Sequence, residues 1–222
     1  AALVAADGLH HPFQGVAAVG WLAAFAAHVL ALRMRALGNL CQAGGLWMLC
    51  LLTAWESSYQ VHRLVEGAAW GDVMWGVVPL AILAAVSLPR RMPSPYVTWG
   101  ALPIAGYLLL WIAASSFAGT WDPSPLPYLP VLSPIDLTVL LGLASLLLWH
   151  SRSSAFLEEK ALPPSVVRVA VAGAAFYWMH GVIFRSVHFG LGVPYDAEAM
   201  FESVVVQTAV AVLWATIGLA CM

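Results

Sequence analysis

Seven long apolar stretches, separated by short polar or proline-rich breaks, account for most of the chain. They cover roughly residues 15–37, 40–55, 69–88, 96–117, 135–149, 165–188 and 202–222. A helix needs about 20 mostly apolar residues to cross a bilayer, and lipid offers the backbone no hydrogen-bond partner. The pattern therefore predicts an all-α fold, a polytopic transmembrane helical bundle of about seven spanning helices in a single domain, residues 1–222.

Composition agrees with lipid as the solvent. Hydrophobic residues make up 62% of the 222 residues and charged residues 9%, with a mean hydropathy of +0.85. A soluble domain has about 45–50% apolar and about 25% charged residues. The lipid bilayer is thus the first expected partner. The net charge of −2 and the absence of a Lys/Arg run give no reason to expect nucleic acid.

The two chain ends are apolar as well. The first six residues, AALVAA, read like the tail of an apolar helix, and the chain stops inside another apolar run at Met222. No positively charged segment precedes the first residues, so they do not form a signal peptide. We expect the chain to be a fragment of a longer membrane protein and to pack against further transmembrane helices of that protein.

Basic residues predict the orientation. With seven spans the loops alternate sides, and one side collects Arg33, Arg35, Arg90, Arg91, Arg152, Lys160 and Arg168. The other side holds only Arg63 and Arg185. Cytoplasmic loops carry the excess of Lys and Arg. This pattern predicts that residue 1 lies on the extracytoplasmic side and residue 222 on the cytoplasmic side.

Acidic residues gather on the predicted extracytoplasmic side, together with histidine and tryptophan. We call this region the outer rim and take it as the candidate ligand-binding site. Its candidate residues are Glu56, Arg63, Asp72, Trp121, Asp122, Asp136, Arg185 and His188.

Three of these residues also have a structural interpretation. Asp136 lies where the fifth helix begins, and a carboxylate there suits the positive end of the helix dipole. Glu56 follows Trp55, so it could lie at the membrane interface or line an outer cavity. Arg185 could extend to water or hold a phosphate or carboxylate with its planar guanidinium group. Arg185 and His188 are three residues apart and share a helix face.

Metal and cofactor chemistry receive no support from the sequence. His28 and His180 are the obvious pair for a haem, but they lie at different depths in their predicted helices. No His-Glu-x-x-His pattern, nucleotide loop or nucleophile elbow is present. We expect no metal and no cofactor, and whether the protein is an enzyme stays open.

Two loop segments resemble the signatures of a known family. Residues 126–137 (LPYLPVLSPIDL) resemble "lPylPllNPldl", with Ser133 in place of Asn, and residues 184–194 (FRSVHFGLGVP) resemble "lRtvHhy-gvp". Gln207, Thr208, Leu213 and Trp214 resemble a "Qt-alsllW" helix. These segments are similar to the membrane proteins grouped as domain of unknown function 2339. The resemblance implies a multi-pass bacterial inner-membrane protein and supplies no reaction, substrate or site residue.

Three functions fit these observations. The first is the binding or processing of an extracytoplasmic polar or lipid-linked ligand at the outer rim, which predicts a pocket lined by Glu56, Arg185, His188 and Trp121. The second is a transporter or channel-like subunit with a polar site near the midplane, touching His28 or His180. The third is a structural membrane scaffold.

Overall fold

The computed structural model describes residues 13, 15–34, 38–65, 69–88, 99–119, 121–159, 163–220 and 222. Within these ranges the chain forms eight α-helices and no strand. The helices are α1 (Val16–Arg33), α2 (Asn39–Leu64), α3 (Trp70–Ser87), α4 (Ala101–Phe117), α5 (Pro134–Glu159), α6 (Pro164–Leu191), α7 (Ala197–Glu202) and α8 (Val204–Ala220). The predicted all-α fold is confirmed for this part of the chain.

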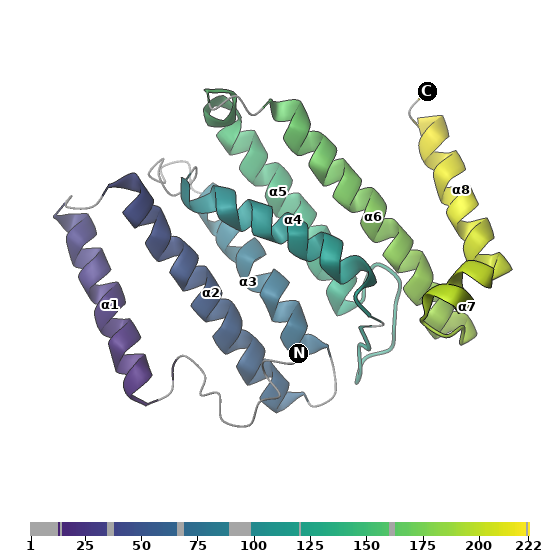
Figure 1. The fold of residues 1–222 in the computed structure, drawn as a ribbon, viewed down its shortest axis with the longest axis horizontal. Coiled ribbons are helices and arrows are strands. Elements are labelled where there is room, and N and C mark those ends of the chain that lie inside the picture. Colours follow the sequence, from purple (N-terminus) through teal and green to yellow (C-terminus); the bar gives the residue numbers. More distant parts are fainter. Residues whose placement is uncertain are drawn as a thin grey trace.

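Successive long helices run in opposite directions, as Figure 1 shows. One end of the bundle carries loop 121–133 and the short helix α7, and we call it the α7 end. The helices lie in a flattened row, with α1 and α8 at opposite edges and α4 crossing in front of α3 and α5 (Figure 1).

The core lies among α2 to α6, where α3 packs against α2, α4 and α5, and α6 packs against α4 and α5. Its centre is built from fully buried aliphatic side chains such as Leu83, Leu108, Ile112 and Leu146. A smaller cluster at the α7 end joins α6, α7 and α8. The edge helices have fewer neighbours: α1 packs on α2, and α8 packs on α6 and α7.

Pro79 lies inside α3, and the hydrogen bond that it removes is replaced from a neighbouring helix. Proline has no amide N–H, so the carbonyl four residues earlier loses its helical partner. That carbonyl belongs to Trp75, and the hydroxyl of Tyr107 on α4 donates to it over 3.2 Å. The compensation matters in an apolar environment, where an unpaired carbonyl is costly.

Helix boundaries depart from the apolar stretches in three places. The second helix continues to Leu64 and the fifth to Glu159, beyond the predicted limits at residues 55 and 149. A short helix that was not predicted, α7, precedes the last stretch and ends at Glu202, and Ser203 separates it from α8. Apolarity reports where a helix contacts lipid or core, so it does not mark where a helix ends.

Three helical segments are long and apolar enough to cross a membrane by length and composition: Trp70–Ser87, Pro134–Ser154 and Ser165–Leu191. Shorter apolar helices occupy Val16–Ala31, Ala101–Phe117 and Val204–Ala220. The residues that the structure describes therefore support a helical membrane-type fold.

Candidate functional site

The α7 end contains a buried ion pair that links two distant parts of the sequence. Asp136 in the first turn of α5 and Arg185 on α6 are both 0% exposed. The Nη2 of Arg185 donates to Oδ1 of Asp136, which also accepts the indole N–H of Trp178 over 2.9 Å. The Nη1 of Arg185 donates to the Ser116 carbonyl at the end of α4 over 2.8 Å. The pair therefore joins α4, α5 and α6.

Ser133 connects the same carboxylate to the start of α5. Its hydroxyl donates to Oδ2 of Asp136 over 2.7 Å and accepts the Asp136 amide over 3.3 Å. A serine oxygen that accepts an amide three residues later is the usual N-terminal cap of a helix. Asp136 thus occupies the position that the helix-dipole interpretation requires, and it also neutralises Arg185.

Tyr128 closes the cluster from loop 121–133. Its ring stacks on Phe189 with centroids 4.6 Å apart, and its hydroxyl lies 3.5 Å from both Oδ2 of Asp136 and Oγ of Ser186. Burial raises the pKa of the Tyr128 hydroxyl. The two segments that carry the family resemblance, residues 126–137 and 184–194, therefore pack against each other here.

Gly181 allows α4 and α6 to approach closely at this cluster. A Cβ atom at position 181 would lie 2.2 Å from the Ser116 carbonyl oxygen and 3.1 Å from Nη1 of Arg185. Any larger residue would push apart the carbonyl and the guanidinium group that it binds.

The outer-rim candidates on α2 and α3 have local partners. Oε1 of Glu56 accepts a hydrogen bond from Gln60 over 2.6 Å. The guanidinium carbon of Arg63 lies 5.9 Å from the centre of the Tyr59 ring. Asp72 lies in the first turn of α3.

The remaining candidates lie in or near the loops of the α7 end. The indole of Trp121 donates to the Ser115 carbonyl over 2.7 Å. Asp122 accepts hydrogen bonds from the hydroxyl and the amide of Ser124, at 2.7 and 3.0 Å, and these bonds lower its pKa. Nδ1 of His188 lies 2.7 Å from the Val193 carbonyl, at the end of α6.

Of the eight candidates, the structure joins Asp136 with Arg185. Arg185 pairs with Asp136 rather than with Glu56 or Asp122, and it is fully buried, so the interpretation that it extends to water is wrong. Its guanidinium group does hold a carboxylate, but one that the protein itself supplies. Ligand binding by the rim residues stays a prediction.

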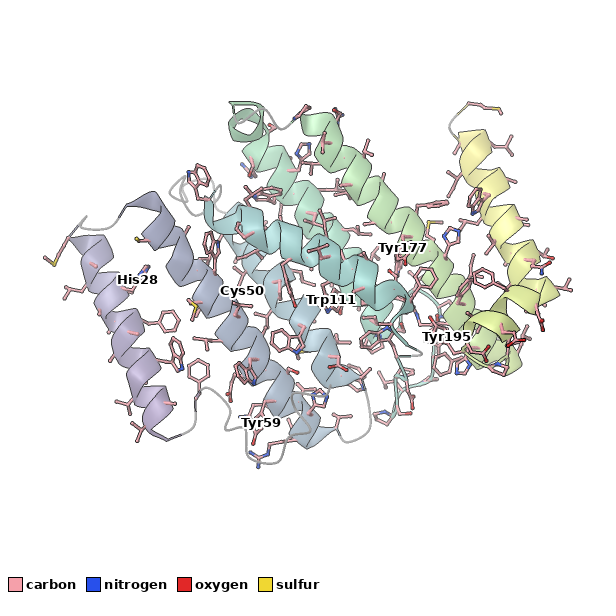
Figure 2. The ribbon with its side chains drawn as sticks, viewed as in Figure 1. His28, Cys50, Tyr59, Trp111, Tyr177 and Tyr195 are labelled. Carbon is pink, nitrogen blue, oxygen red and sulfur yellow. The ribbon has the colours of Figure 1, made fainter. Side chains whose placement is uncertain are left out.

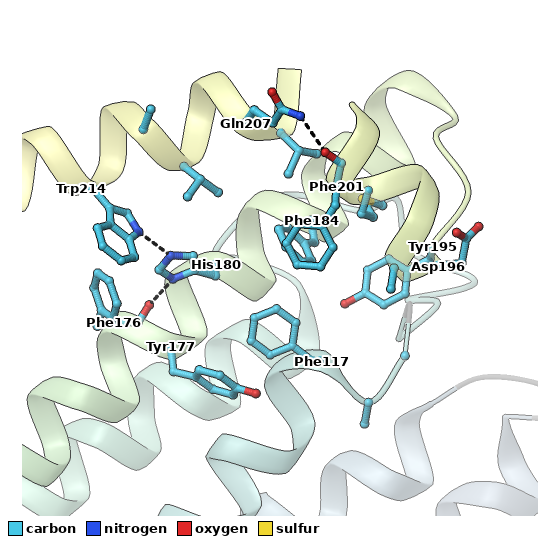
Figure 3. Close-up of a pocket in the computed structure, with 17 residues that line it drawn as sticks. Phe117, Phe176, Tyr177, His180, Phe184, Tyr195, Asp196, Phe201, Gln207 and Trp214 are labelled. Atoms are coloured by element: carbon cyan, nitrogen blue, oxygen red, sulfur yellow. Dashed lines mark hydrogen bonds between the residues drawn. The ribbon is translucent and has the colours of Figure 1, made fainter. Parts of the chain in front are cut away.

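A groove of about 1200 Å³ lies beside this cluster (Figure 3). We call it the α6–α8 groove, since those helices form its walls, while α7 and the end of α4 border it. It is lined by Phe117, Ala118, Gly119, Phe176, Tyr177, His180, Phe184, Tyr195, Asp196, Ala197, Met200, Phe201, Val206, Gln207, Val210, Ala211 and Trp214.

The sequence analysis did not identify this groove. One signal was present: Phe176, His180 and Phe184 recur every four residues and therefore share one face of α6. The opposite wall could not be anticipated, because it requires knowing that α8 lies across from that face. The transporter hypothesis instead places His180 at a polar site near the membrane midplane.

His180 connects the two walls of the groove (Figure 3). The indole N–H of Trp214 on α8 donates to Nε2 of His180 over 2.9 Å, and Nδ1 lies 2.8 Å from the Phe176 carbonyl. An indole N–H can only donate. Nε2 therefore accepts from Trp214, and Nδ1 is the nitrogen that donates to the Phe176 carbonyl.

The Tyr195 hydroxyl and the Arg185 side chain lie close to each other at the α7 end. The hydroxyl and Nε of Arg185 are both buried, and within the described part of the chain neither makes a hydrogen bond of ordinary length and angle. Burial raises the pKa of Tyr195, and the nearby charge of Arg185 acts in the opposite direction. Tyr195 also lines the groove, so its hydroxyl is the polar group that connects the groove with the buried ion pair.

Histidine is the residue that most often binds a metal or a haem. Among the residues that the structure describes, no group of three or more His, Cys, Asp or Glu side chains could hold a metal ion. His28 lies on α1 at one edge of the molecule (Figure 2), whereas His180 on α6 faces α8 near the other edge. These two histidines do not face each other.

The outer surface of the helices is strongly apolar. Val16 is 89% exposed, Val212 is 60% exposed and Leu219 is 72% exposed. Side chains of this kind on edge helices are suited to lipid, so the fold and its surface define a helical membrane protein.

The comparison with known families agrees. A family model described as "Predicted membrane protein (DUF2339)" matches residues 1–222, so the chain belongs to this family of predicted membrane proteins. The resemblance drawn from the loop segments is confirmed, and it supports a lipid bilayer environment. No curated protein and no solved structure matches the chain.

Proposed function

We propose that this chain is a multi-pass protein of the bacterial inner membrane that binds an amphipathic, lipid-type ligand in the α6–α8 groove. The observation that carries the proposal is the groove itself, a cavity of about 1200 Å³ walled by aromatic and aliphatic side chains. Ligand sites are typically concave, largely apolar and furnished with a few polar groups.

Seven spanning helices form part of the proposal. Successive long helices alternate in direction (Figure 1), and the shortest of them, α4 and α8, have 17 residues each. At about 1.5 Å per residue such a helix is about 26 Å long, close to the hydrocarbon thickness of about 30 Å. In this arrangement α7 is too short to span and lies at the membrane surface.

Sidedness rests on the sequence. The excess of basic residues on one side favours the cytoplasm for that side and the extracytoplasmic space for the α7 end. Four of those residues, Arg35, Arg90, Arg91 and Lys160, lie outside the described residues. The groove would then open at the extracytoplasmic end, where the polar or lipid-linked ligand was expected.

The nature of the lining favours a lipid over a small polar solute. His180 has both ring nitrogens engaged, by Trp214 and by the Phe176 carbonyl. An ion at that depth would have few side chains to coordinate it. An acyl chain could pack against Phe176, Phe184 and Trp214. The groove therefore supports lipid binding more than transport through a polar site at mid-depth.

Binding is also better supported than hydrolytic chemistry at the rim. A paired-carboxylate mechanism would need two of the rim acids to converge with room for substrate. Asp136 is buried and bound by Arg185, Trp178 and Ser133. Its carboxylate is already occupied by the ion pair and by hydrogen bonds within the protein. We therefore propose a binding function and no reaction.

The test is to fill the groove from one wall. Ala211 lines the groove, and its neighbour Val212 on α8 is 60% exposed and does not line it. Ala211→Trp should remove a lipid that remains bound to the detergent-purified protein in native mass spectrometry, while the control Val212→Trp should retain it. If the wild type and Ala211→Trp retain lipid equally, or neither retains any, the groove is not the binding site.

A further inference from the structure

We infer that a cavity between α2, α3 and α4 is a second binding site, which takes the terminal part of an acyl chain from a membrane lipid. This α2–α4 cavity has a volume of about 210 Å³, and its lining includes Cys50, Ala54, Trp75, Pro79, Ile104 and Tyr107. The inference uses the seven-helix membrane arrangement proposed above and does not depend on the α6–α8 groove.

Short side chains on facing helices leave this space open. Cys50 and Ala54 are four residues apart on α2 and therefore lie on one helix face. Pro79 lies on α3, and its compact ring does not extend across to α2. Protein interiors are close packed and contain few voids larger than a water molecule. A space of about 210 Å³ is therefore large enough to accept a ligand.

The lining favours a hydrocarbon over a polar ligand. The indole of Trp47 lines the cavity and donates to the Gly100 carbonyl over 2.8 Å. The Tyr107 hydroxyl donates to the Trp75 carbonyl that Pro79 leaves without a helical partner. Apolar cavities stay free of water and take up apolar molecules, and a cavity of about 150 Å³ holds benzene. The α2–α4 cavity thus has room for several carbons of an acyl chain.

The cavity reaches the outer surface of the bundle, where the chain enters. Leu51 on α2 and Pro103 on α4 belong to its lining and are exposed, whereas Cys50, Ala54 and Ile104 are buried. In the seven-helix arrangement the exposed residues of α2 and α4 contact lipid. An acyl chain is therefore the molecule that meets the mouth of the cavity.

The depth of the cavity selects the end of the chain. Pro79 is nine residues from Trp70 and eight residues from Ser87, the two ends of α3. At about 1.5 Å per residue it lies about 14 Å from one helix end. The hydrocarbon core is about 30 Å thick, so the chains of one leaflet extend about 15 Å. The carbons that reach the cavity are the last ones of the chain.

The experiment compares two positions of a photoreactive group on one phospholipid. The group is placed either at the terminal carbon of the acyl chain or next to the ester. The full chain is reconstituted with each lipid and irradiated, and cross-linked residues are identified by peptide mass spectrometry. We expect the terminal group to label Cys50, Trp75 and Tyr107, and the ester-proximal group to leave these three residues unlabelled.

A variant that fills the cavity tests whether labelling comes from inside it. Ala54→Phe should abolish labelling of Trp75 and Tyr107 and should keep labelling of Leu110, which is exposed on α4. The matched control is Leu49→Phe, because Leu49 lies on α2, is exposed and does not line the cavity. This control should keep both signals.

A second variant makes the test independent of how well Ala54→Phe folds. Ile104→Ala removes side-chain volume from the cavity wall and leaves a larger space. Labelling of Trp75 by the terminal group should rise by about twofold, because the enlarged cavity admits more of the chain.

The inference and the membrane arrangement fail in different ways. If the terminal group labels Leu110 but not Trp75 or Tyr107, or if Ile104→Ala or a folded Ala54→Phe leaves labelling unchanged, the cavity is not an acyl-chain site. If the terminal group labels neither the cavity nor the exposed residues of α2 and α4, the proposed seven-helix arrangement fails and this inference fails with it. Lipid binding in the α6–α8 groove is tested separately by Ala211→Trp.

Discussion

Two regions share helix α6 and differ in almost every property. Arg185 belongs to the buried ion pair, and the adjacent Phe184 lines the α6–α8 groove. Successive helical residues point about 100° apart, so neighbouring positions serve two separate environments. One is polar, closed and occupied by the protein's own groups, whereas the other is aromatic and open.

The contrast shows that converging charges in a membrane protein need not form a functional site. A charge inside a bilayer is expensive, so it is usually paired or placed at a cavity. The Arg185 charge is paired with Asp136, whose carboxylate also accepts hydrogen bonds from the Trp178 indole and the Ser133 hydroxyl. The groove differs from the buried ion pair because it has open volume that a ligand could occupy.

The largest expected effect comes from breaking the ion pair. Arg185→Met or Asp136→Ala alone should lower the free energy of unfolding by about 3–5 kcal/mol, because the remaining partner is left as an uncompensated buried charge. Denaturant unfolding in detergent measures this. The double variant Arg185→Met with Asp136→Leu should recover most of the loss. Single variants within about 1 kcal/mol of wild type would show that the pair does not hold the fold together.

The next effect concerns the close approach of α4 and α6. Gly181→Ala places a Cβ against the Ser116 backbone, so overpacking of about 1–3 kcal/mol is expected. Gly173→Ala on the same helix meets nothing within 4 Å, and it should be neutral or stabilising by up to about 1 kcal/mol. Thermal unfolding of the two variants side by side gives the comparison, and equal behaviour would contradict the packing described here.

A smaller effect is expected from the hydrogen bond that joins α8 to α6 across the groove. Trp214→Phe keeps an aromatic wall but removes the hydrogen bond to His180, which is worth about 1 kcal/mol. We expect faster amide hydrogen exchange in α8 with little change in α4 and α5. Trp70→Phe removes the bond to the Ser124 carbonyl, away from the groove lining, and serves as the control. Unchanged exchange in α8 would show that this bond does not attach α8 to α6.

The smallest effect is expected at the exposed loop acid Asp122. Hydrogen bonds from Ser124 lower the pKa of Asp122, so its small stabilising contribution is complete above the unfolded pKa and is lost as the pH falls through the lowered folded pKa. Asp122→Asn should change stability by no more than about 0.5 kcal/mol, and only above that pH range. Unfolding curves at neutral and acidic pH measure it, and a larger loss at acidic pH would have the wrong sign.

The sequence predicted the fold better than the site. Hydropathy shows which segments face lipid or core, and these became the long helices. The extension of α2 to Leu64 and the break at Ser203 depend instead on local hydrogen bonds, which hydropathy does not describe. Asp136 and Arg185 were each identified as candidates, yet they are 49 positions apart and their contact follows from helix packing. The groove requires two helix faces to meet, and a single sequence shows each face separately.

The most direct test of the central claim is to map where a lipid sits. The protein would be reconstituted with a phospholipid that carries a photoreactive group along its acyl chain, and cross-linked residues would be identified by peptide mass spectrometry. Enrichment at Phe176, Phe184 and Trp214 over exposed residues such as Val212 and Leu219, with loss of that enrichment in Ala211→Trp, is the predicted result. Cross-links spread evenly over the exposed helices, unchanged in Ala211→Trp, would contradict it.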